Sequence, residues 1–480
     1  MINLIKNELF KIIHKPGLYI LLAFSLSSIV LNCFIASYDD YGTVGVIYYY
    51  EGLEENLKDY DLSDAAELNY YIGDKTIVEA YKLYKDYSYD SPEYYFVEND
   101  VTANIQCMNE ALYRDKDEYK YNECKALYDK QVLLLNNFDW KTVINDRIKE
   151  NDNLINEYKA AKNGDTLNDS ELDNQINYLE EENKIYEYRI ENNVPLSYST
   201  VSNELDNYLN SYQEFQTLEL DESKYKNRGD LERKREIEST YFTTKYMLEH
   251  DMLLKEENDY MADNFVYIFI TLDIFLLIAA IMIAGSIVSD EFSKGTIKQL
   301  LLKPFTRNDI LTSKIVASVV AFLGFTVVYT LLNVLVSSIF FQGFSSFLDP
   351  IIVYDFSKSA VVEYGVFEYS MLHFVSLLPA YFILMLFTLF IGILTTNTTG
   401  AIVSGFVLFG LSTLIFDLTL TESMIFLPFI HWDFTSYLFG GLHWFKYTTF
   451  GISVFIVTIY IVVLLVLSYI LFNFKDIKNQ

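Results

Sequence analysis

The sequence predicts an all-α membrane protein with six transmembrane helices, and two observations lead to this prediction. Several apolar runs reach about twenty residues, the length that a helix needs to cross a bilayer. Between the first and second of these runs, residues 39–263 are polar, poor in glycine and carry a net charge of about −28. The whole chain carries −29, so its pI of about 4.5 reflects this one domain and not the membrane part.

The N-terminal residues predict an amphipathic helix that lies in the membrane interface. In residues 1–16, isoleucine and leucine side chains form a broad apolar face, with Lys6 and Lys11 mostly opposite. Pro16 is expected to end this helix. The apolar residues 17–38 then predict the first transmembrane helix. A cleavable signal peptide is the alternative, but its apolar core usually has about 7–15 residues, fewer than this run.

The C-terminal half predicts five more spans, with the second at 264–289 and the third to sixth within 314–480. The six apolar runs are Leu18–Ser37, Phe265–Val288, Ile315–Phe341, Leu372–Leu394, Ala401–Ile415 and Phe450–Phe472. Lysine and arginine cluster before the first run, at 290–313 and after the last run, and cationic loops stay in the cytoplasm. We therefore expect cytoplasmic termini, an extracellular domain at 39–263, and a multi-pass protein of a bacterial plasma membrane.

The extracellular domain is predicted to be mainly helical, because it is rich in Glu, Asp, Lys, Asn, Leu and Tyr. Long helices are expected over Asp139–Ala161, Asp169–Asn192 and Ser202–Asn264. The many tyrosines have two interpretations. They fill half-buried helix faces while their hydroxyl groups reach water, or they form a surface for cationic, amphipathic ligands through cation–π contacts and long-range charge.

The three cysteines leave one question open. Cys107 and Cys124 are both in the predicted extracellular domain and are separated by a short loop, so a disulfide is geometrically conceivable. Two cysteines do not make a disulfide framework, so two free thiols are the alternative. Cys33 lies in the first predicted span, where a buried thiol is expected.

Residues 421–447 are too apolar for a free external loop and are interrupted by Pro428 and Gly440. They predict short re-entrant helices that dip into the outer leaflet, where protein must satisfy the broken backbone. The pairs His431-Trp432 and His443-Trp444 predict an aromatic belt at the membrane interface, with metal binding or proton relay as the alternative.

Two polar residues lie within the predicted spans. Asp273 is in the second span and Asn333 is in the third. Ionisable and amide groups at membrane depth serve either a substrate pathway or a hydrogen bond between helices, and the sequence leaves both interpretations open.

The segment DEFSKGTIKQLLLKP at 290–304 carries a family resemblance. Together with NELFKII at 7–13 and the order of the spans, it resembles the permease (transmembrane) subunit of the type-2 ABC exporters, whose cytoplasmic coupling helix contacts an ATPase. The close resemblance covers about 40 residues, and the domain at 39–263 is an insertion that the common family pattern lacks. The resemblance implies ATPase-coupling roles for Glu291, Gly295, Thr296, Ile297, Leu300, Leu301, Pro304, Arg307, Lys314 and Glu8.

The residue types of this segment independently favour a docking helix. Gly295 permits a tight turn, Ile297 and Leu300 share a helical face, and Pro304 ends the helix. An exposed apolar face on a cytoplasmic loop indicates a partner. The alternative is a helix held against the inner leaflet by its lysines, without a partner.

The functional expectation is a transport subunit and not an enzyme, because the chain has no phosphate-binding Gly-x-x-x-x-Gly-Lys-Ser/Thr loop, no His-Glu-x-x-His pair and no serine-nucleophile motif. The resemblance implies cytoplasmic ABC ATPase subunits that bind ATP and magnesium, a second permease chain, and export of an amphipathic substrate through the lipid bilayer. Antimicrobial or cationic peptides and lipids are candidate substrates, whereas nucleic acid and a metal in this chain are not expected. An ATPase-free scaffold or surface receptor and a ligand-sensing membrane protein are the alternatives.

Overall fold

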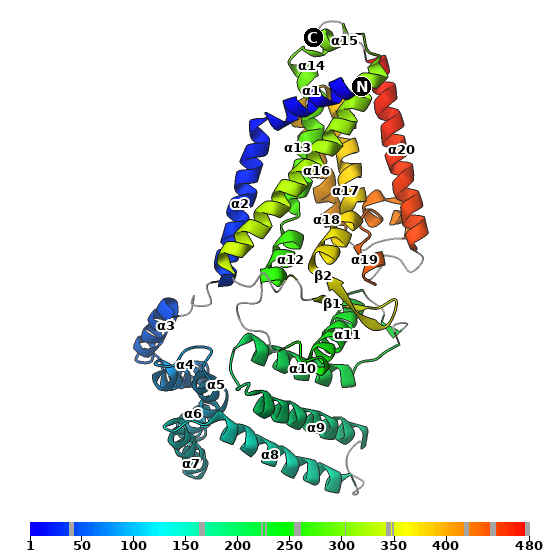
Figure 1. Ribbon diagram of the computed structural model, residues 1–480. Helices are drawn as coiled ribbons and strands as arrows, with labels where there is room; N and C mark the ends of the chain where they lie inside the picture. Colours follow the sequence, from blue (N-terminus) through cyan, green and yellow to red (C-terminus); the bar gives the residue numbers. More distant parts are fainter. Residues whose placement is uncertain are drawn as a thin grey trace. The chain divides into compact units, whose positions relative to one another are not determined.

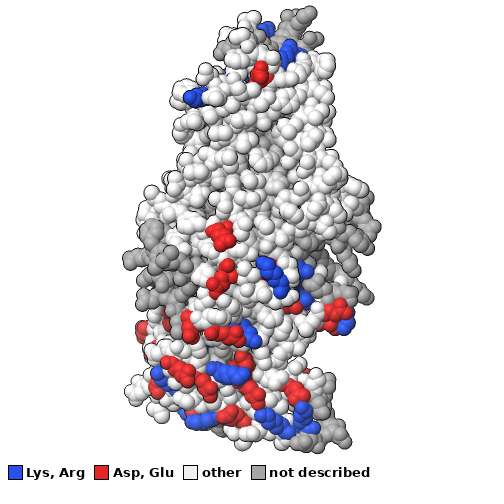
Figure 2. Space-filling model, turned by 45° about the vertical axis from the view of Figure 1, so that its right-hand side comes forward, with Lys and Arg blue, Asp and Glu red and all other residues white. Residues whose placement is uncertain are grey.

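A computed structural model describes residues 1–37, 43–162, 169–221, 224–225, 228–253, 261–302, 304–341, 347, 350–416, 422–441 and 448–475. The chain divides into two compact units. The first, the membrane unit, comprises Met1–Tyr38 and Asn258–Gln480, and the second, the helical domain, comprises Asp39–Glu257. Figure 2 shows few charged side chains on the visible face of the membrane unit and many on the helical domain.

The membrane unit is built from long apolar helices, as predicted. Five helices in the described part of the chain are long and apolar enough to cross a bilayer. They are α2 (Pro16–Ser37), α13 (Ile274–Ile287) continued by α14 (Ser289–Ser293), α16 (Arg307–Phe340), α17 (Val366–Thr395) and α20 (Phe450–Phe474). The predicted fifth span is the helix α18 (Thr398–Phe416), whose described apolar part, Thr398–Ser412, is shorter than the others. The all-α class is confirmed, and the number of spans stays a prediction.

The helices of the membrane unit pack around α13. Of its apolar window, 72% is buried, against 17% for α20, and α13 contacts α16, α17 and α18. The amphipathic helix α1 (Ile2–Ile13) ends before Pro16, as predicted, and packs on α16. Figure 1 shows the N-terminus, α14 and the C-terminal end of α20 at one end of this unit, and their placement on the cytoplasmic side of the membrane stays a prediction.

The second predicted span is not one continuous helix, and this expectation was wrong. The helix α12 (Met261–Thr271) ends before Asp273, and α13 begins after it. Around the junction, the amide of Leu276 donates to the carbonyl of Asp273 at 2.8 Å, a three-residue spacing tighter than that of an α-helix. Aspartate is a poor residue for a helix interior, which explains the break inside an otherwise apolar run.

The other end of the membrane unit contains a β-hairpin that was not predicted. Strands β1 (Pro350–Asp355) and β2 (Ala360–Gly365) pair antiparallel, with Pro350 opposite Gly365 and Asp355 opposite Ala360. Both strands contain adjacent β-branched residues, which is the sequence signal that could have found them.

The predicted re-entrant segment forms short helices beside this hairpin. They are η6 (Glu422–Phe426), η7 (Pro428–Ile430) and α19 (Thr435–Leu438). Gly440 has a φ of +71°, and a Cβ there would lie 2.7 Å from the amide nitrogen of Phe356, so only glycine fits against the hairpin turn. His431 and Trp432 are buried and do not form the predicted interface belt, whereas His443 and Trp444 lie outside the described residues.

The helical domain contains α3 (Thr43–Asn56), α4 (Ala65–Tyr84), α5 (Pro92–Phe96), η1 (Val97–Val101), α6 (Thr102–Asn109), η2 (Glu110–Asp115), α7 (Glu118–Leu135), α8 (Trp140–Ala161), α9 (Asp169–Asn192), α10 (Thr200–Gln216) and α11 (Arg228–Glu249). The predicted helices at Asp139–Ala161 and Asp169–Asn192 are confirmed as α8 and α9, and the carboxylate of Asp139 caps α8.

The predicted long helix Ser202–Asn264 is divided, and this expectation was wrong. Between α10 and α11, the amide of Asp221 donates to the Glu219 carboxylate at 3.1 Å and the hydroxyl of Tyr225 donates to the Glu219 carbonyl at 2.8 Å. Such local bonds compete with helical ones.

The two cysteines of the helical domain are not free thiols. Cys107 and Cys124 form a disulfide between α6 and α7.

Candidate functional site

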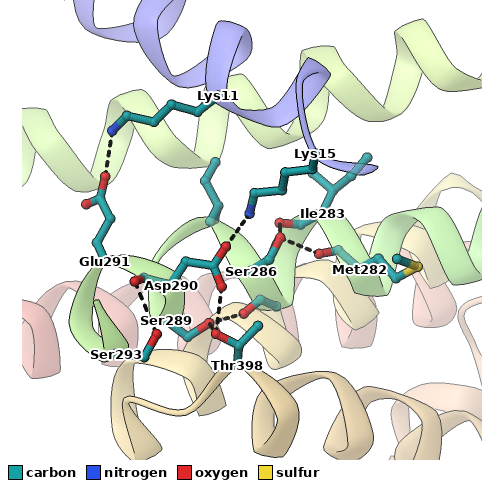
Figure 3. Close-up of polar contacts among 12 residues, drawn as sticks. Lys11, Lys15, Met282, Ile283, Ser286, Ser289, Asp290, Glu291, Ser293 and Thr398 are labelled. Atoms are coloured by element: carbon teal, nitrogen blue, oxygen red, sulfur yellow. Dashed lines mark hydrogen bonds and ion pairs between the residues drawn. The ribbon is translucent and has the colours of Figure 1, made fainter. Parts of the chain in front are cut away.

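Four charged side chains form a closed ion-pair ring at one end of the membrane unit. Lys11 Nζ lies 2.9 Å from Glu8 Oε1 and 2.7 Å from Glu291 Oε1. Lys314 Nζ lies 2.8 Å from Glu8 Oε2 and 2.9 Å from Glu291 Oε2. The two ammonium groups thus alternate with the two carboxylates, so the charges of the ring cancel. Figure 3 shows the Lys11–Glu291 side of the ring.

Three helices that are distant in sequence supply the ring. Glu8 and Lys11 are three residues apart and share one face of α1. Glu291 belongs to α14, and Lys314 lies about two turns inside α16. A capping box between Thr306 and Asp309 fixes the start of α16. Lys314 Nζ also donates to the carbonyl of Ile287 at the end of α13, at 3.1 Å.

Most of the ring is buried. The side chains of Lys314, Glu8 and Glu291 are 1%, 3% and 9% exposed, whereas that of Lys11 is 43% exposed. Removing one partner of a buried ion pair leaves an uncompensated charge and typically costs about 3–5 kcal/mol. The ring therefore holds α1, α14 and α16 together more firmly than surface ion pairs would.

The environment keeps the groups contributed by α1 charged. Burial opposes ionisation of Glu8, but the Lys314 and Lys11 ammonium groups outweigh it and hold the pKa of Glu8 below its usual value. Burial likewise opposes the charge of Lys11, and the Glu291 and Glu8 carboxylates overcome it and raise the pKa of Lys11. Both groups are therefore ionised at neutral pH.

A second set of polar contacts lies next to the ring and joins the start of α2 to α18. Lys15 Nζ pairs with Asp290 Oδ2 at 2.8 Å, and the hydroxyl of Thr398 donates to Asp290 Oδ1 at 2.7 Å (Figure 3). The hydroxyl of Ser289 donates to Thr398 Oγ1 at 3.1 Å. Burial lowers the pKa of Lys15 despite its partner Asp290. The adjacent residues Asp290 and Glu291 thus connect α14 to different neighbours, Asp290 to the start of α2 and to α18, and Glu291 to α1 and α16.

A cavity of about 570 Å³ opens beside both sets of contacts. Its walls come from α1, from the end of α13 and from the segment that follows. The lining residues are Asn7, Glu8, Lys11, Ile12, His14, Lys15, Pro16, Ser286, Ile287, Asp290, Glu291, Lys294, Thr296 and Gln299. The ring therefore borders a hollow surface and is not enclosed in the apolar core.

The segment after α14 forms a turn and a short helix, as predicted for a coupling helix. Gly295 has a φ of +67° and no atom within 4 Å of the position of a Cβ, so the left-handed backbone alone requires glycine there. Helix α15 (Ile297–Leu301) follows. Thr296 is exposed, and its hydroxyl donates to the Glu291 carbonyl at 3.5 Å.

The exposed apolar residue of this segment differs from the predicted ones. Ile297 is 2% exposed and packs in the core, so the expectation that it faces a partner was wrong, whereas Leu302 is 87% exposed. Pro304 is exposed, and the side chains of Leu300 and Leu301 lie outside the described part of the chain. Helical spacing alone did not show which side of so short a helix meets the membrane unit.

The remaining predicted coupling residue, Arg307, binds another helix. Its Nη1 donates to the carbonyl oxygens of Phe472, Asn473 and Lys475, at 3.1, 2.7 and 3.1 Å. These carbonyls belong to the end of α20, where an arginine satisfies backbone acceptors that lack a helical partner. Arg307 therefore fixes α20 to the start of α16.

The two polar residues predicted at membrane depth are not brought together. Asn333 is fully buried, and its Nδ2 donates to the carbonyl of Phe265 in α12 at 3.0 Å while its Oδ1 accepts from Ser337 at 3.3 Å. This geometry is that of a hydrogen bond between helices. Asp273 is half-buried at the α12–α13 junction, and its side chain caps neither helix.

Sequence reasoning missed Lys11, Lys15, Asp290 and Thr398 as members of these contacts. Lys11 was interpreted as part of the polar face of the N-terminal helix and of the segment with the family resemblance, and the lysines before the first span were interpreted as cations that fix the orientation in the membrane. A weak signal was available, because Lys11 lies three residues after Glu8, a spacing that favours an ion pair on a helix.

Long apolar helices and an ion-pair ring at one end define a multi-pass membrane protein, and comparison with known proteins assigns its family. The profile of the ABC-2 family transporter proteins matches residues 2–477. The chain belongs to this family and is a membrane transport component, which confirms the resemblance found in residues 7–13 and 290–304.

One relative and the solved structures complete the comparison. YdbK, an uncharacterised membrane protein of Bacillus subtilis (strain 168), is 30% identical over 212 residues, which are 43% of this chain and 80% of YdbK. No solved structure matches the chain.

Proposed function

We propose that the chain is the permease subunit of an ATP-driven exporter, and that residues 289–302 receive the movement of a separate cytoplasmic ABC ATPase. The single observation that carries this proposal is the ion-pair ring of Glu8, Lys11, Glu291 and Lys314. Through the ring, a displacement of the coupling segment is passed to α1 and α16.

The cost of breaking the ion-pair ring favours transmission of a displacement to α1 and α16 over a movement of α14 alone. If α14 moved alone, it would pull the Glu291 carboxylate away from two ammonium groups, and leaving a buried charge unpaired costs about 3–5 kcal/mol. Moving α1 and α16 with α14 keeps both contacts. Rigid-body movement of packed helices is the usual way in which an effector site drives a larger transition.

The surface for the ATPase is expected at the tip of the coupling segment. Leu302 is 87% exposed and Phe305 is 36% exposed, and they flank the exposed Pro304. Exposed apolar side chains next to charged ones favour a protein partner over solvent. ATP and magnesium are assigned to that partner, with no cofactor in this chain.

The proposal also includes the transported substrate and the number of permease chains in the transporter. An amphipathic molecule, such as an antimicrobial or cationic peptide or a lipid, is moved outward, past a domain at 39–263 that faces the outside. A second permease chain, identical or related, completes the path. The sparse burial of α20 and α2, 17% and 22% of their apolar windows, leaves surface for that chain and for the bilayer.

Site-specific photocrosslinking tests this function. A photoreactive amino acid at Leu302 in native membranes should capture a nucleotide-binding ATPase. The same amino acid at Ile339, which is 70% exposed in α16, is the matched control and should capture none. If a well-expressed chain captures no ATPase at residue 302, the proposal fails and the scaffold, receptor or sensor alternatives gain support.

A further inference from the structure

Four tyrosines of the helical domain form a partly exposed cluster, which we call the Tyr198 cluster. The rings of Tyr89 and Tyr198 are stacked, with centroids 4.8 Å apart and an interplanar angle of 17°. Tyr94 lies 5.2 Å from Tyr89 and 6.1 Å from Tyr198, and Tyr95 lies 5.1 Å from Tyr198. Tyr89 is 56% exposed despite this stacking, so much of its ring remains accessible to a ligand.

A carboxylate belongs to this cluster. Glu98 is exposed and follows Tyr94 by four residues on the same helical run of α5 and η1, a spacing that brings side chains together. The next residue, Asn99, donates from Nδ2 to the hydroxyl of Tyr198 at 3.0 Å, which fixes Tyr198 beside this turn. The Glu98 carboxylate thus lies beside Tyr94 and the Tyr198 hydroxyl, which come from two parts of the domain.

The electrostatics agree with this geometry. Burial and then the Glu98 carboxylate raise the pKa of Tyr94 to about 12 and that of Tyr89 above its usual value. Burial and Glu98 also raise the pKa of Tyr198. In the part of the chain that the structure describes, Glu98 forms no ion pair with a lysine or arginine, so none of the described cations compensates its charge.

At two other places in the same domain, tyrosine and glutamate side chains lie around a lysine ammonium group of the protein itself. Lys75 Nζ lies 6.0 and 5.4 Å from the ring centroids of Tyr71 and Tyr113, and 3.3 Å from Glu79. Lys245 Nζ lies 5.6 Å from the centroid of Tyr241 and 3.9 Å from Glu249. In both places an ammonium group lies near a glutamate and one or two tyrosine rings. The Tyr198 cluster also has rings and a glutamate, but among the described residues no lysine or arginine forms an ion pair with that glutamate.

We propose that the Tyr198 cluster and Glu98 bind a primary ammonium group from outside the protein, such as a lysine side chain of a cationic peptide. The faces of the tyrosine rings attract the cation, and the exposed Glu98 carboxylate forms an ion pair with it. The net charge of about −28 on residues 39–263 brings cationic ligands to this surface. The inference gives a class of ligand for the proposed exporter. It rests on the proposed function in one respect only, namely that the bound ligand is also the molecule that is transported.

Binding by the full chain without an ATPase tests the inference. The probe is pentalysine with acetylated and amidated ends, titrated at low salt against the protein in nanodiscs of zwitterionic lipid. We expect saturable binding by the natural sequence, weakened about tenfold by Glu98→Gln and about threefold by Tyr89→Leu. Tyr89 is mostly exposed, and an unchanged helical circular dichroism spectrum verifies that each variant is folded.

The matched control is Glu110→Gln, which changes the net charge equally. The Glu110 carboxylate is already paired with Arg114 at 2.7 Å, so its removal should weaken pentalysine binding by less than about twofold. Equal losses for Glu98→Gln and Glu110→Gln would reduce the effect to diffuse charge attraction and overturn the inference, as would an absence of binding. Because no ATPase is present, neither result depends on the proposed coupling mechanism.

Discussion

The two units of this protein use buried ion pairs in different ways. In the helical domain, Arg189 is fully buried and pairs with Asp206 at 2.7 Å, only 17 residues away. In the membrane unit, the ring pairs Lys11 with Glu291 and Lys314 with Glu8 across 280 and 306 residues. The first arrangement stabilises one local turn. The second joins elements that are far apart in the sequence.

The surroundings of Arg189 show this local role. Its guanidinium donates to the hydroxyl and the carbonyl of Ser202 at 2.9 and 3.2 Å, and to the carbonyl of Pro195 at 3.2 Å. Pro195 lies between α9 and α10, and Ser202 lies in the first turn of α10, so the arginine, which belongs to α9, holds the connection between the two helices. Burial lowers the pKa of Arg189 and raises that of Asp206, so the desolvation cost is only partly offset by the pairing. An ion pair of this type maintains a local shape, whereas we propose that the ring also transmits a displacement.

The largest expected effect is that of Lys314→Met. It leaves the Glu8 and Glu291 carboxylates facing each other in a buried site, which should destabilise the membrane unit by about 3–5 kcal/mol. Thermal unfolding in nanodiscs measures this loss. Lys358→Met is the control in the same unit, because the Lys358 side chain is 60% exposed and its partner Asp355, which is 3% exposed, keeps hydrogen bonds from the amide and the hydroxyl of Ser357, so this variant should cost less than Lys314→Met. Equal effects of the two variants would contradict a special role for the ring.

A smaller and local effect is expected from Arg189→Lys. Lysine keeps the charge but lacks the planar fork that reaches Ser202, Pro195 and Asp206 together, so we expect a loss of about 2 kcal/mol. Amide hydrogen exchange should increase in α9 and α10 and remain unchanged in α1 and α16. Faster exchange in α1 would show that this ion pair is not local.

The contribution of the ion-pair ring to stability should depend on pH. The pKa of Glu8 is lower in the folded chain than its ordinary value of 4.5, so its contribution to stability is complete above that value and is lost as the pH falls through the lower folded value. Unfolding temperatures of the natural sequence should therefore fall more steeply below about pH 4.5 than those of Glu8→Gln. Parallel curves would show that Glu8 gains nothing from its partners.

The smallest effect is expected from Gly295→Ala. The added methyl group meets no atom within 4 Å, so only the left-handed backbone opposes it, at a cost of about 1–2 kcal/mol. Capture of the ATPase from residue 302 should decrease several-fold, with little change in the unfolding temperature of the membrane unit. A large drop in that temperature would show that the turn is part of the core.

Sequence patterns predicted the features that depend on neighbouring residues. Apolar runs predicted the long helices, and a proline and a glycine predicted the end of α1 and the turn at Gly295. The resemblance identified Glu8, Glu291 and Lys314 together, but their contact across 306 residues depends on how α1 crosses α16, which no local pattern contains. The break at Asp273 was missed because one polar residue barely changes the hydropathy of an apolar run.

The distance between α1 and the coupling segment, measured by double electron–electron resonance, tests most directly whether the ion-pair ring holds these two elements together. Spin labels at the exposed residues Lys6 and Gln299 report on the two elements in nanodiscs. We expect one narrow distance distribution in the natural sequence, which Lys314→Met broadens and Lys358→Met does not. An unchanged distribution in Lys314→Met would contradict the claim that the ring holds these elements together.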